Sequence, residues 1–438
     1  MSEESSEETD SDDEEQHCVF DNGSGLTKVG FSGDDAPLSV FPTIVGRPRD
    51  KDTMPPDSPD FYYGEEVKQK RGVLFIRYPV EHGIITSWDD MEHLWQLCFK
   101  EELKVEPEEH CTLLTEPPLH PKCNREKMTQ IMIEQHNVPG IYLAQQPVLA
   151  LYASGRTTGT VVSVGDGTAD IVPVYEGYAL PHAIPRMNIS GRDITWQLQR
   201  LLSEQGYSFY TSGDRDIVNA IKEKLGYIAL DYDAELKVPT TAEPKLAVFQ
   251  EYYATTKRTD RVEIMDEVFG RNISRIVHQY LPQSAEQDFA FQSMVENAKE
   301  TTYELPDGKL ITVGNQRFRA TEILFNPAFC GREEPGLMDH LNWSIMRCDE
   351  EIRKDLYGNV LLSGGSTLFH GFAQRVEKEL KSRAPASTKV NVIAPPKRHL
   401  SAWIGGSILS SLSTFQSMWL TKDEYDESGP ALIHKKCF

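Results

Sequence analysis

The sequence has no long hydrophobic run. No apolar stretch among its 438 residues approaches the roughly 20 residues that a bilayer-spanning helix needs. The first residues include glutamate and aspartate where a secretory signal peptide has lysine or arginine. We therefore expect neither a membrane span nor a signal peptide, and we predict a cytoplasmic protein, with the nucleus as the alternative.

Cysteine is scarce, and its spacing does not indicate a metal site. The seven cysteines are odd in number, and no two form a C-x-x-C pair. A disulfide framework and a zinc site are therefore both disfavoured, and free thiols in a reducing compartment are expected.

Basic residues are too few to balance the acidic ones. The 45 lysines and arginines stand against 67 aspartates and glutamates, which leaves a formal net charge of -22. This charge argues against DNA or an anionic lipid surface as the main partner. Nine of the acids and no base lie within residues 1–15. We interpret this segment as a disordered acidic tail with too little apolar surface to fold; the alternative is a docking site for basic partners.

The rest of the composition fits a large soluble protein. A hydrophobic content of 39% over this length is enough to bury the cores of two or more domains. Strand-like and helix-like patterns alternate along the chain, which predicts an α/β fold.

Two short glycine turns each lie between β-rich apolar runs, at residues 21–25 (DNGSG) and 165–167 (GDG). Each predicts a strand, a tight turn and a second strand. We expect the glycines to adopt positive φ and to bring backbone N–H groups against an anion, because no Cβ blocks the approach. One such turn usually marks an ordinary hairpin, but the repetition indicates a pair of phosphate clamps.

Each turn also carries one carboxylate, Asp21 or Asp166. A carboxylate repels a phosphate, so we do not expect these side chains to touch it directly. A hydrated Mg²⁺ between them resolves the conflict, since Mg²⁺ keeps several waters and is often held by one or two carboxylates together with phosphate oxygens.

A third glycine turn, at residues 362–367 (LSGGST), follows a strand-like pair at 360–361 and precedes a helix-like run at 372–380. This turn suits the nucleoside end of a nucleotide, where flat apolar contact and backbone approach matter more than charge.

Several longer strings accompany the three turns, and together they resemble the actin family. The strings are FPTIVGRPR at 41–49, LYASGRTTG at 151–159, YEGYALPHAI at 175–184, AWIGGS at 402–407 and DEYDESGPALIHKKCF at 423–438. The similarity runs from about residue 16 to the last residue and is broken by one long insertion at 234–299.

The resemblance implies a two-lobed actin-like ATPase fold of the α/β class, with duplicated lobes, the nucleotide in the cleft between them and four subdomains. The implied division is 16–42, 79–153 and 401–438 for subdomain 1, 43–78 with a proline-rich loop for subdomain 2, 154–189 and 333–400 for subdomain 3, and 190–332 with the insertion for subdomain 4.

The resemblance also implies ATP and Mg²⁺ as cofactors. By match to the family, Asp21 and Asp166 hold Mg²⁺ through water. The residues matched to the phosphates are Ser24, Gly25, Leu26, Lys28, Gly165, Asp166, Gly167 and Thr168. Those matched to the adenosine end are Lys222 and Glu223, in a predicted helix at 217–230, with Gly364, Gly365, Ser366, Leu368, Phe369 and His399.

The catalytic residues of the family are only partly kept. Gln146 matches the glutamine that orients the attacking water, a role that suits an amide because it donates and accepts without charge. The family has aspartate where Ser163 stands and histidine where Asp170 stands. Asp170 either substitutes as a general base or repels the phosphate, and we expect hydrolysis to be slow. Three further changes weaken or retune the nucleoside end: Asn219 replaces an arginine, His399 a lysine and Leu400 a tyrosine.

The segments that the family uses for assembly are altered. Residues 50–62, which match the mobile loop between subunits, are acidic and rich in proline, which hinders strand-like docking. The loop that faces it is partly kept at 325–330. In the insertion, apolar residues recur at helical spacing from Val262 to Tyr280, and a second helix follows. These stripes either pack on each other and on subdomain 4, or bind a partner.

A hydrophobic groove that binds partners in the family is better kept. Its matching residues are Tyr152, Thr157, Gly177, Tyr178, Leu409, Thr414 and Met418.

Two functions follow from the resemblance. One is a divergent cytoskeletal actin-like protein that binds Mg-ATP and assembles into filaments, with weak ATPase activity at most. The other is a non-polymerising actin-related protein, an ATP-bound scaffold subunit of a larger complex such as a chromatin remodeller. A sugar kinase or chaperone ATPase of the same two-lobed fold is disfavoured, because the matching strings also lie outside the glycine turns.

Overall fold

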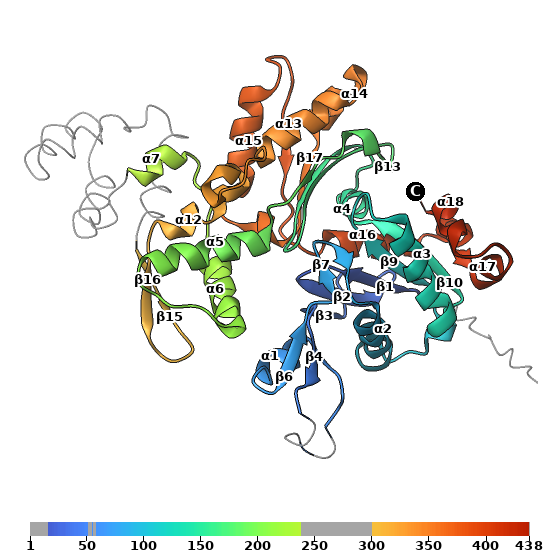
Figure 1. Cartoon of the computed structure of the whole chain (residues 1–438). Helices are drawn as coiled ribbons and strands as arrows, with labels where there is room; N and C mark the ends of the chain where they lie inside the picture. The colour runs from blue at the N-terminus through green and yellow to red at the C-terminus, as the bar shows by residue number, and fades with distance from the viewer. Residues whose placement is uncertain (1–15, 51–54, 56–57, 238–299, 438) are drawn as a thin grey trace, which may run out of the picture. The chain divides into compact units, whose positions relative to one another are not determined.

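The computed structural model describes residues 16–50, 55, 58–237 and 300–437. The acidic tail, parts of the proline-rich loop and almost all of the insertion, with both of its predicted helices, lie outside these residues. The chain forms two compact units, whose elements are labelled in Figure 1. Unit 1 comprises Met1–Arg186, Ser344–Gly365 and Ala394–Phe438, and unit 2 comprises Met187–Trp343 and Ser366–Ile393.

The first sheet of unit 1 has the strand order β19-β10-β9-β1-β2-β3. Strand β1 is antiparallel to β2 and parallel to β9, which is parallel to β10. Every residue of β9 is buried, as expected of a strand that is covered on both faces. The strands are β1 (Cys18–Asn22), β2 (Leu26–Phe31), β3 (Ser39–Pro42), β9 (Thr112–Glu116), β10 (Gly140–Gln145) and β19 (Leu420–Thr421).

Helices pack against this sheet. Helix α16 contacts α4 and β1, and its fully buried Trp403 donates its indole N–H to the Val19 carbonyl at 3.0 Å. The helices that accompany the sheet are α2 (Trp88–Leu97), α3 (Lys122–Gln130), α4 (Gln146–Ala153), α16 (Ser401–Ser411), α17 (Lys422–Ser428) and α18 (Ile433–Lys436).

A second sheet in unit 1 repeats one local arrangement of the first. Its order is β13-β12-β11-β17, with β11 antiparallel to β12 and parallel to β17. In both sheets, therefore, a glycine turn joins an antiparallel pair, and a parallel strand lies beside the first strand of that pair. The elements are β11 (Gly159–Val164), β12 (Ala169–Tyr175), β13 (Tyr178–Ala179), β17 (Val360–Ser363) and the helix before β17, α14 (Glu350–Gly358).

These elements confirm the predicted strand–turn–strand pattern at both clamps. At the third turn, β17 and helix α15 (Phe372–Arg383) confirm the predicted strand and helix.

Smaller elements of unit 1 follow β3 in the chain. Strands β4 (Val45–Pro48), β5 (Tyr62–Tyr63) and β6 (Leu74–Arg77) form a sheet of order β5-β4-β6, which helix α1 (Gly64–Gln69) accompanies. Strands β7 (Val80–Glu81) and β8 (Ile84–Ile85) form a separate hairpin.

Unit 2 is mainly helical. Its elements are α5 (Gly191–Glu204), α6 (Ser212–Leu225), α7 (Tyr232–Leu236), the hairpin of β15 (Thr301–Glu304) and β16 (Leu310–Val313), α12 (Gln316–Arg319) and α15. At the boundaries between the units along the chain lie β14 (Arg186–Met187), α13 (Leu337–Arg347) and β18 (Val392–Ile393).

Helix α6 corrects the predicted helix at 217–230 at both ends. It begins at Ser212, because Thr211 and Asp214 form a capping box that satisfies free N–H groups of the first turn. It ends at Leu225, because Gly226 is extended and a Cβ there would lie 2.5 Å from the Lys222 carbonyl oxygen.

The predicted α/β class is confirmed, with several sheets and flanking helices. Within the described residues, no helix combines the length and the apolar character that a membrane crossing requires. The division into four subdomains stays a prediction.

Candidate functional site

The two glycine turns of unit 1 touch each other. A Cβ on Gly25 would lie 2.8 Å from Cβ of Asp166, and a Cβ on Gly167 would lie 2.3 Å from Oγ of Ser24. Real Cβ atoms do not approach other atoms so closely, so a side chain at either glycine would force the turns apart. The two turns, which are distant in the sequence, can therefore pack together only because Gly25 and Gly167 have no side chain.

The expected reason for these glycines is wrong. None of the turn glycines, Gly23, Gly25, Gly165 and Gly167, adopts the left-handed backbone conformation. Close packing of one turn on the other explains Gly25 and Gly167 instead. Positive φ occurs instead at the third turn, where Gly364 has φ of 88° and a Cβ would lie 2.4 Å from the Val164 carbonyl oxygen.

A third hairpin, which the sequence motifs did not predict, joins the two turns. Strands β7 and β8 are connected by His82 and Gly83, both with positive φ (48° and 75°), as in a type I′ turn. The Gly83 N–H donates to Ser24 Oγ at 2.9 Å, and His82 Nδ1 lies 2.9 Å from the Gly167 carbonyl oxygen. The pair His-Gly between short β-branched runs was the available sequence signal.

Asp21 lies at the centre of a buried polar network. The side chain is only 2% exposed and accepts hydrogen bonds from Lys28 Nζ at 2.5 Å, Thr115 Oγ1 at 2.6 Å and Gln146 Nε2 at 2.8 Å. Burial acts to raise the pKa of Asp21, but the charge of Lys28 and these hydrogen bonds outweigh it and lower the pKa below its ordinary value. Asp21 is therefore a stable carboxylate at neutral pH. The sequence motifs did not reveal Thr115.

The structure thus brings several predicted residues together. Asp21 precedes the first turn, Asp166 contacts it at Gly25, and Lys28 and Gln146 both bind Asp21. The two proposed magnesium carboxylates flank one turn.

Asp170 and Ser163, the two departures from the family pattern, are cross-strand neighbours in the β11–β12 ladder. Asp170 is 3% exposed. Burial raises the pKa of Asp170 to about 6, although a hydrogen bond with Thr168 and the charge of Arg186 act in the opposite direction. The groups that act on Asp170 are Thr168 and Arg186, whereas Gln146 donates to Asp21 and Thr115.

Replacing Asp170 with asparagine should stabilise the protein at neutral pH. The pKa of Asp170 is about 6 in the folded protein and 3.8 for the free carboxyl. The stability contributed by the protonated Asp170 is therefore fully present below pH 3.8 and is lost as the pH rises through 6. At about 1.36 kcal/mol per pKa unit, with some relaxation of the site, we expect Asp170→Asn to gain about 2 kcal/mol at pH 7.5. Urea unfolding between pH 4 and pH 8 measures this. An equal gain at pH 4 and pH 7.5 would contradict it.

The backbone beside His399 contacts the third glycine turn. The neighbouring Arg398 carbonyl accepts from the Gly364 N–H at 3.1 Å. Burial, then the charges of Lys28, Arg398 and Lys397, lower the pKa of His399, so its ring is neutral. Its buried Nδ1 has no hydrogen-bond partner among the described residues.

The remaining adenosine residues, apart from Gly365 at the edge of unit 1, belong to unit 2. Lys222 is buried and donates to the Gly191 carbonyl and to Thr195 Oγ1, both at 3.0 Å. Asn219 donates to Glu223 at 2.8 Å. Asn219, which stands where the family has an arginine, therefore holds a residue predicted for the adenosine end. A Cβ on Gly226 would lie 2.9 Å from the ring of Phe369. Gly365, Ser366 and Leu368 lie in one short 3-10 helix, Gly365–Leu368.

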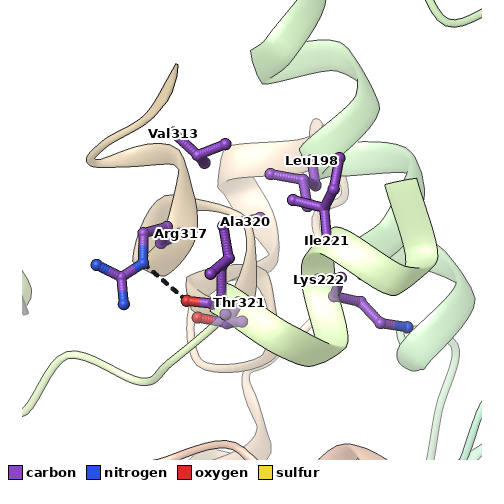
Figure 2. Close-up of a pocket in the computed structure, with 9 residues that line it drawn as sticks. Leu198, Ile221, Lys222, Val313, Arg317, Ala320 and Thr321 are labelled. Atoms are coloured by element: carbon purple, nitrogen blue, oxygen red, sulfur yellow. Dashed lines mark hydrogen bonds between the residues drawn. The ribbon is translucent and has the colours of Figure 1, made fainter. Parts of the chain in front are cut away.

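A narrow crevice lies beside Lys222. Figure 2 shows Leu198 and Ile221 in its lining, with Arg317 and Lys222 pointing in opposite directions. Arg317 donates to the Leu225 carbonyl at 2.8 Å. The contacts of Lys222 with Gly191 and Thr195, and of Arg317 with Leu225, hold helix α6 against its neighbours.

The predicted partner groove lies in unit 1. Tyr152 donates to the Gly177 carbonyl at 3.3 Å, and the Gly177 N–H donates to the Thr157 carbonyl at 2.8 Å. Tyr178 is exposed. Leu409 and Met418 pack with Tyr152 on the core of the first sheet, and Thr414 is exposed. Partner binding at this groove stays a prediction.

The residues of the site fit a polyanion with a metal. The glycine contacts hold the two turns together, Asp21 is ionised, and polar atoms of Asn22 and His399 are buried without a partner among the residues described. Such atoms normally have a partner in a complete site.

Comparison with known families gives one result. A family model described as Actin matches residues 12–438, nearly the whole chain. The fold of that family typically binds a nucleotide and a divalent metal.

Proposed function

The chain belongs to the actin family, and on this premise we propose that it is a divergent cytoskeletal actin-like protein that binds ATP with Mg²⁺ and assembles into filaments. The proposal places it in the cytoplasm, with itself and actin-binding proteins as partners. The observation that supports it most strongly is the ionised, fully hydrogen-bonded Asp21 beside two glycine turns in direct contact.

In this proposal the nucleotide supplies the phosphoanhydride bond, and Mg²⁺ offsets its charge. The chain's own residues bind and orient. Asp21 is held as a carboxylate by Lys28, so it attracts a hydrated cation without moving. Ser24 is fixed by the Gly83 N–H, which keeps the first turn in one conformation. Asp166 contacts that turn from the second clamp.

Slow hydrolysis follows from the groups around Gln146. Its amide nitrogen donates to Asp21 and to Thr115 at 3.2 Å, which leaves the amide oxygen as the group that accepts from a water. The imidazole of the family is replaced by Asp170, a buried carboxyl whose raised pKa leaves it protonated in part near pH 6. Loss of the imidazole forfeits part of the 10²- to 10⁴-fold that general base catalysis contributes.

Restoring the two family residues should therefore speed phosphate release. We expect the double variant Ser163→Asp with Asp170→His to release phosphate at least about 10-fold faster than wild type, with ATP affinity changed far less. A malachite green assay under single-turnover conditions, with labelled-nucleotide titration in parallel, measures both quantities. Brisk release by the wild type would show that the slow-hydrolysis part of the proposal is wrong.

Nucleotide binding is tested directly on the full chain. Titration with fluorescent ATP, with and without Mg²⁺, should saturate at one nucleotide per chain and weaken when Mg²⁺ is removed. Failure to saturate under either condition would refute the proposal.

A non-polymerising scaffold subunit is the second candidate, and contacts of Arg332 in unit 2 favour it. Arg332 follows the partly kept assembly loop 325–330, pairs with Asp193 at 2.6 Å and donates to the Asn188 carbonyl at 2.5 Å. These contacts hold the end of that loop against the start of helix α5 and restrict its movement toward a neighbouring subunit.

High-speed pelleting separates the two candidates. After addition of ATP, Mg²⁺ and salt, a filament-forming protein moves to the pellet and a scaffold subunit stays in the supernatant. The variant Arg332→Ala, which releases the loop, should increase the pelleted fraction if the tether limits assembly.

A further inference from the structure

Three neighbouring strands of the first sheet, β1, β9 and β10, lead to one group of polar side chains. In the parallel β1–β9 ladder, Phe20 is aligned with Leu114. The residues that follow them, Asp21 and Thr115, therefore lie side by side. Gln146 begins helix α4 directly after β10, the other neighbour of β9. Ligand-binding side chains of α/β folds commonly lie at the carboxyl ends of parallel strands, so Thr115 lies among the residues that the proposed site uses.

Thr115 closes a triangle of hydrogen bonds with Asp21 and Gln146. The Thr115 hydroxyl donates to Oδ1 of Asp21 at 2.6 Å, and Gln146 Nε2 donates to the same oxygen at 2.8 Å. The same Nε2 also donates to Thr115 Oγ1 at 3.2 Å. Lys28 binds the other carboxylate oxygen, Oδ2, at 2.5 Å. Oδ1 therefore accepts from the two uncharged residues, and Oδ2 accepts from the cation.

The charge of Asp21 sets the direction of these hydrogen bonds. Burial acts to raise the pKa of Asp21, but the charge of Lys28 and the hydrogen bonds lower it, so the carboxylate only accepts. Thr115 must then give its single hydroxyl hydrogen to Asp21, and it offers only lone pairs to Gln146. Both oxygens that face the Gln146 amide are thus acceptors. The amide presents its nitrogen to them, and its oxygen is left for another donor.

Thr115 supplies the second of the two contacts that fix this amide. A group held at one point still rotates about that contact, whereas a second contact to a different residue removes the rotation. Thr115 is 3% exposed, and Gln146 is partly exposed. Thr115 therefore acts through Gln146 and not on a ligand. A misplacement of about 1 Å in a reacting geometry costs about 100-fold in rate, so the second contact matters for catalysis.

We propose that Thr115 is a positioning residue for the proposed hydrolysis: its hydroxyl, which donates to Asp21, holds the Gln146 amide in the orientation that offers the amide oxygen to a water beside the nucleotide. This role rests on the proposed function. Thr115 forms no covalent bond and transfers no proton, since its hydrogen stays in the bond to Asp21. Because Lys28 binds Oδ2 and not Oδ1, loss of the Thr115 hydroxyl should slow phosphate release and leave nucleotide affinity nearly unchanged.

Single-turnover release of phosphate from ATP labelled at the γ-position tests the proposal on the full chain. We expect Thr115→Val, which keeps the shape and removes the hydroxyl, to release phosphate about 10- to 100-fold more slowly than wild type. Its affinity for fluorescent Mg-ATP should change far less. Thr115→Ser keeps the hydroxyl and should retain most of the wild-type rate. The same variants combined with Ser163→Asp and Asp170→His give the comparison at a higher rate.

Thr112→Val is the matched control. Thr112 is buried in the same strand, and its hydroxyl donates to the His110 carbonyl at 3.4 Å, outside the triangle. This variant should change neither the rate nor the affinity. If Thr112→Val slowed phosphate release as much as Thr115→Val, loss of a buried hydroxyl from β9 would explain the effect, and the positioning role would be wrong.

The Gln146 amide itself gives a readout that needs neither turnover nor nucleotide. With nitrogen-15 in the glutamine side chains, its signal is assigned by its loss in Gln146→Met, and the exchange of its hydrogens with solvent is then measured by NMR. Exchange should be faster in Thr115→Val than in wild type and unchanged in Thr115→Ser and Thr112→Val. Equal exchange in Thr115→Val and wild type would show that Thr115 does not hold the amide.

The remaining outcomes separate this inference from the proposed function. Phosphate release by Thr115→Val at the wild-type rate would overturn the positioning role alone. A parallel loss of rate and affinity would also overturn it, because the hydroxyl would then serve the fold of the whole site. Absence of saturable nucleotide binding by the wild type would instead overturn the proposed function, and the positioning role with it.

Discussion

Replacing Asp21 with alanine should abolish Mg-ATP binding and lower the free energy of unfolding by about 3–5 kcal/mol. The variant leaves the Lys28 ammonium, whose side chain is 11% exposed, without its carboxylate in a buried site. It also leaves Thr115 and Gln146 without their shared acceptor. Urea unfolding followed by circular dichroism measures the stability, and titration with fluorescent ATP measures the binding.

A second variant separates the two consequences. Asp21→Ala combined with Lys28→Met removes the uncompensated charge as well as the carboxylate, so most of the lost stability should return. Nucleotide binding should not return, because the group that attracts the hydrated cation is still missing. Recovery of binding in the double variant would show that Asp21 acts only by balancing Lys28, and the proposed metal role would be wrong.

The control for both variants is Asp89→Ala. Asp89 pairs with Arg47 at 2.5 Å, but its side chain is 67% exposed. An exposed pair of this kind contributes less than about 1 kcal/mol. If Asp89→Ala and Asp21→Ala lowered the free energy of unfolding by similar amounts, burial of the ion pair would not be the cause of the Asp21 effect.

The sequence predicted the parts of the site that are local in the chain. Both clamps appear as strand, turn and strand because β-branched residues favour extended backbone and the glycines between the runs permit a tight turn. The end of helix α6 was misplaced because Gly226 stops it inside an otherwise periodic apolar pattern. Local pattern therefore identified the elements more reliably than their ends.

The parts that were missed depend on contacts between distant segments. Gly83 reaches Ser24 across 59 residues, His82 reaches Gly167 across 85 and Thr115 reaches Asp21 across 94. No single-sequence pattern encodes such pairings. The same limit explains the wrong reason given for the clamp glycines, since a glycine kept for positive φ and one kept for close packing look identical in a sequence.

The family resemblance supplied residue roles that neither the sequence pattern nor the geometry of the structure contains. It identified Gln146 as the residue beside the reacting group, and the structure then placed it on Asp21. It could not reveal that the Asn22 amide is buried without a hydrogen-bond partner among the described residues. An unsatisfied atom is visible only once the fold has surrounded it.

Replacing Gly167 with alanine should cost about 100-fold in ATP affinity and destabilise the fold by about 1–3 kcal/mol. The added Cβ would lie 2.3 Å from Ser24 Oγ, 2.6 Å from Ser24 Cβ and 3.1 Å from the His82 nitrogen. Ser24 must move, which breaks its hydrogen bond from the Gly83 N–H and displaces the first clamp from the second. Gly72→Ala, at a glycine with ordinary φ and no atom within 4 Å of the new Cβ, is the control and should change neither quantity.

Adding Ser24→Gly to Gly167→Ala tests whether the collision itself is responsible. The double variant removes both Ser24 atoms nearest to the new Cβ, so the free energy of unfolding should recover by most of the 1–3 kcal/mol. Affinity should stay low, because the Gly83 N–H then has no acceptor to hold the first turn. If stability fails to recover, strain elsewhere in the β11–β12 turn is the cause. If affinity recovers fully, the contact between the turns is needed for folding and not for binding.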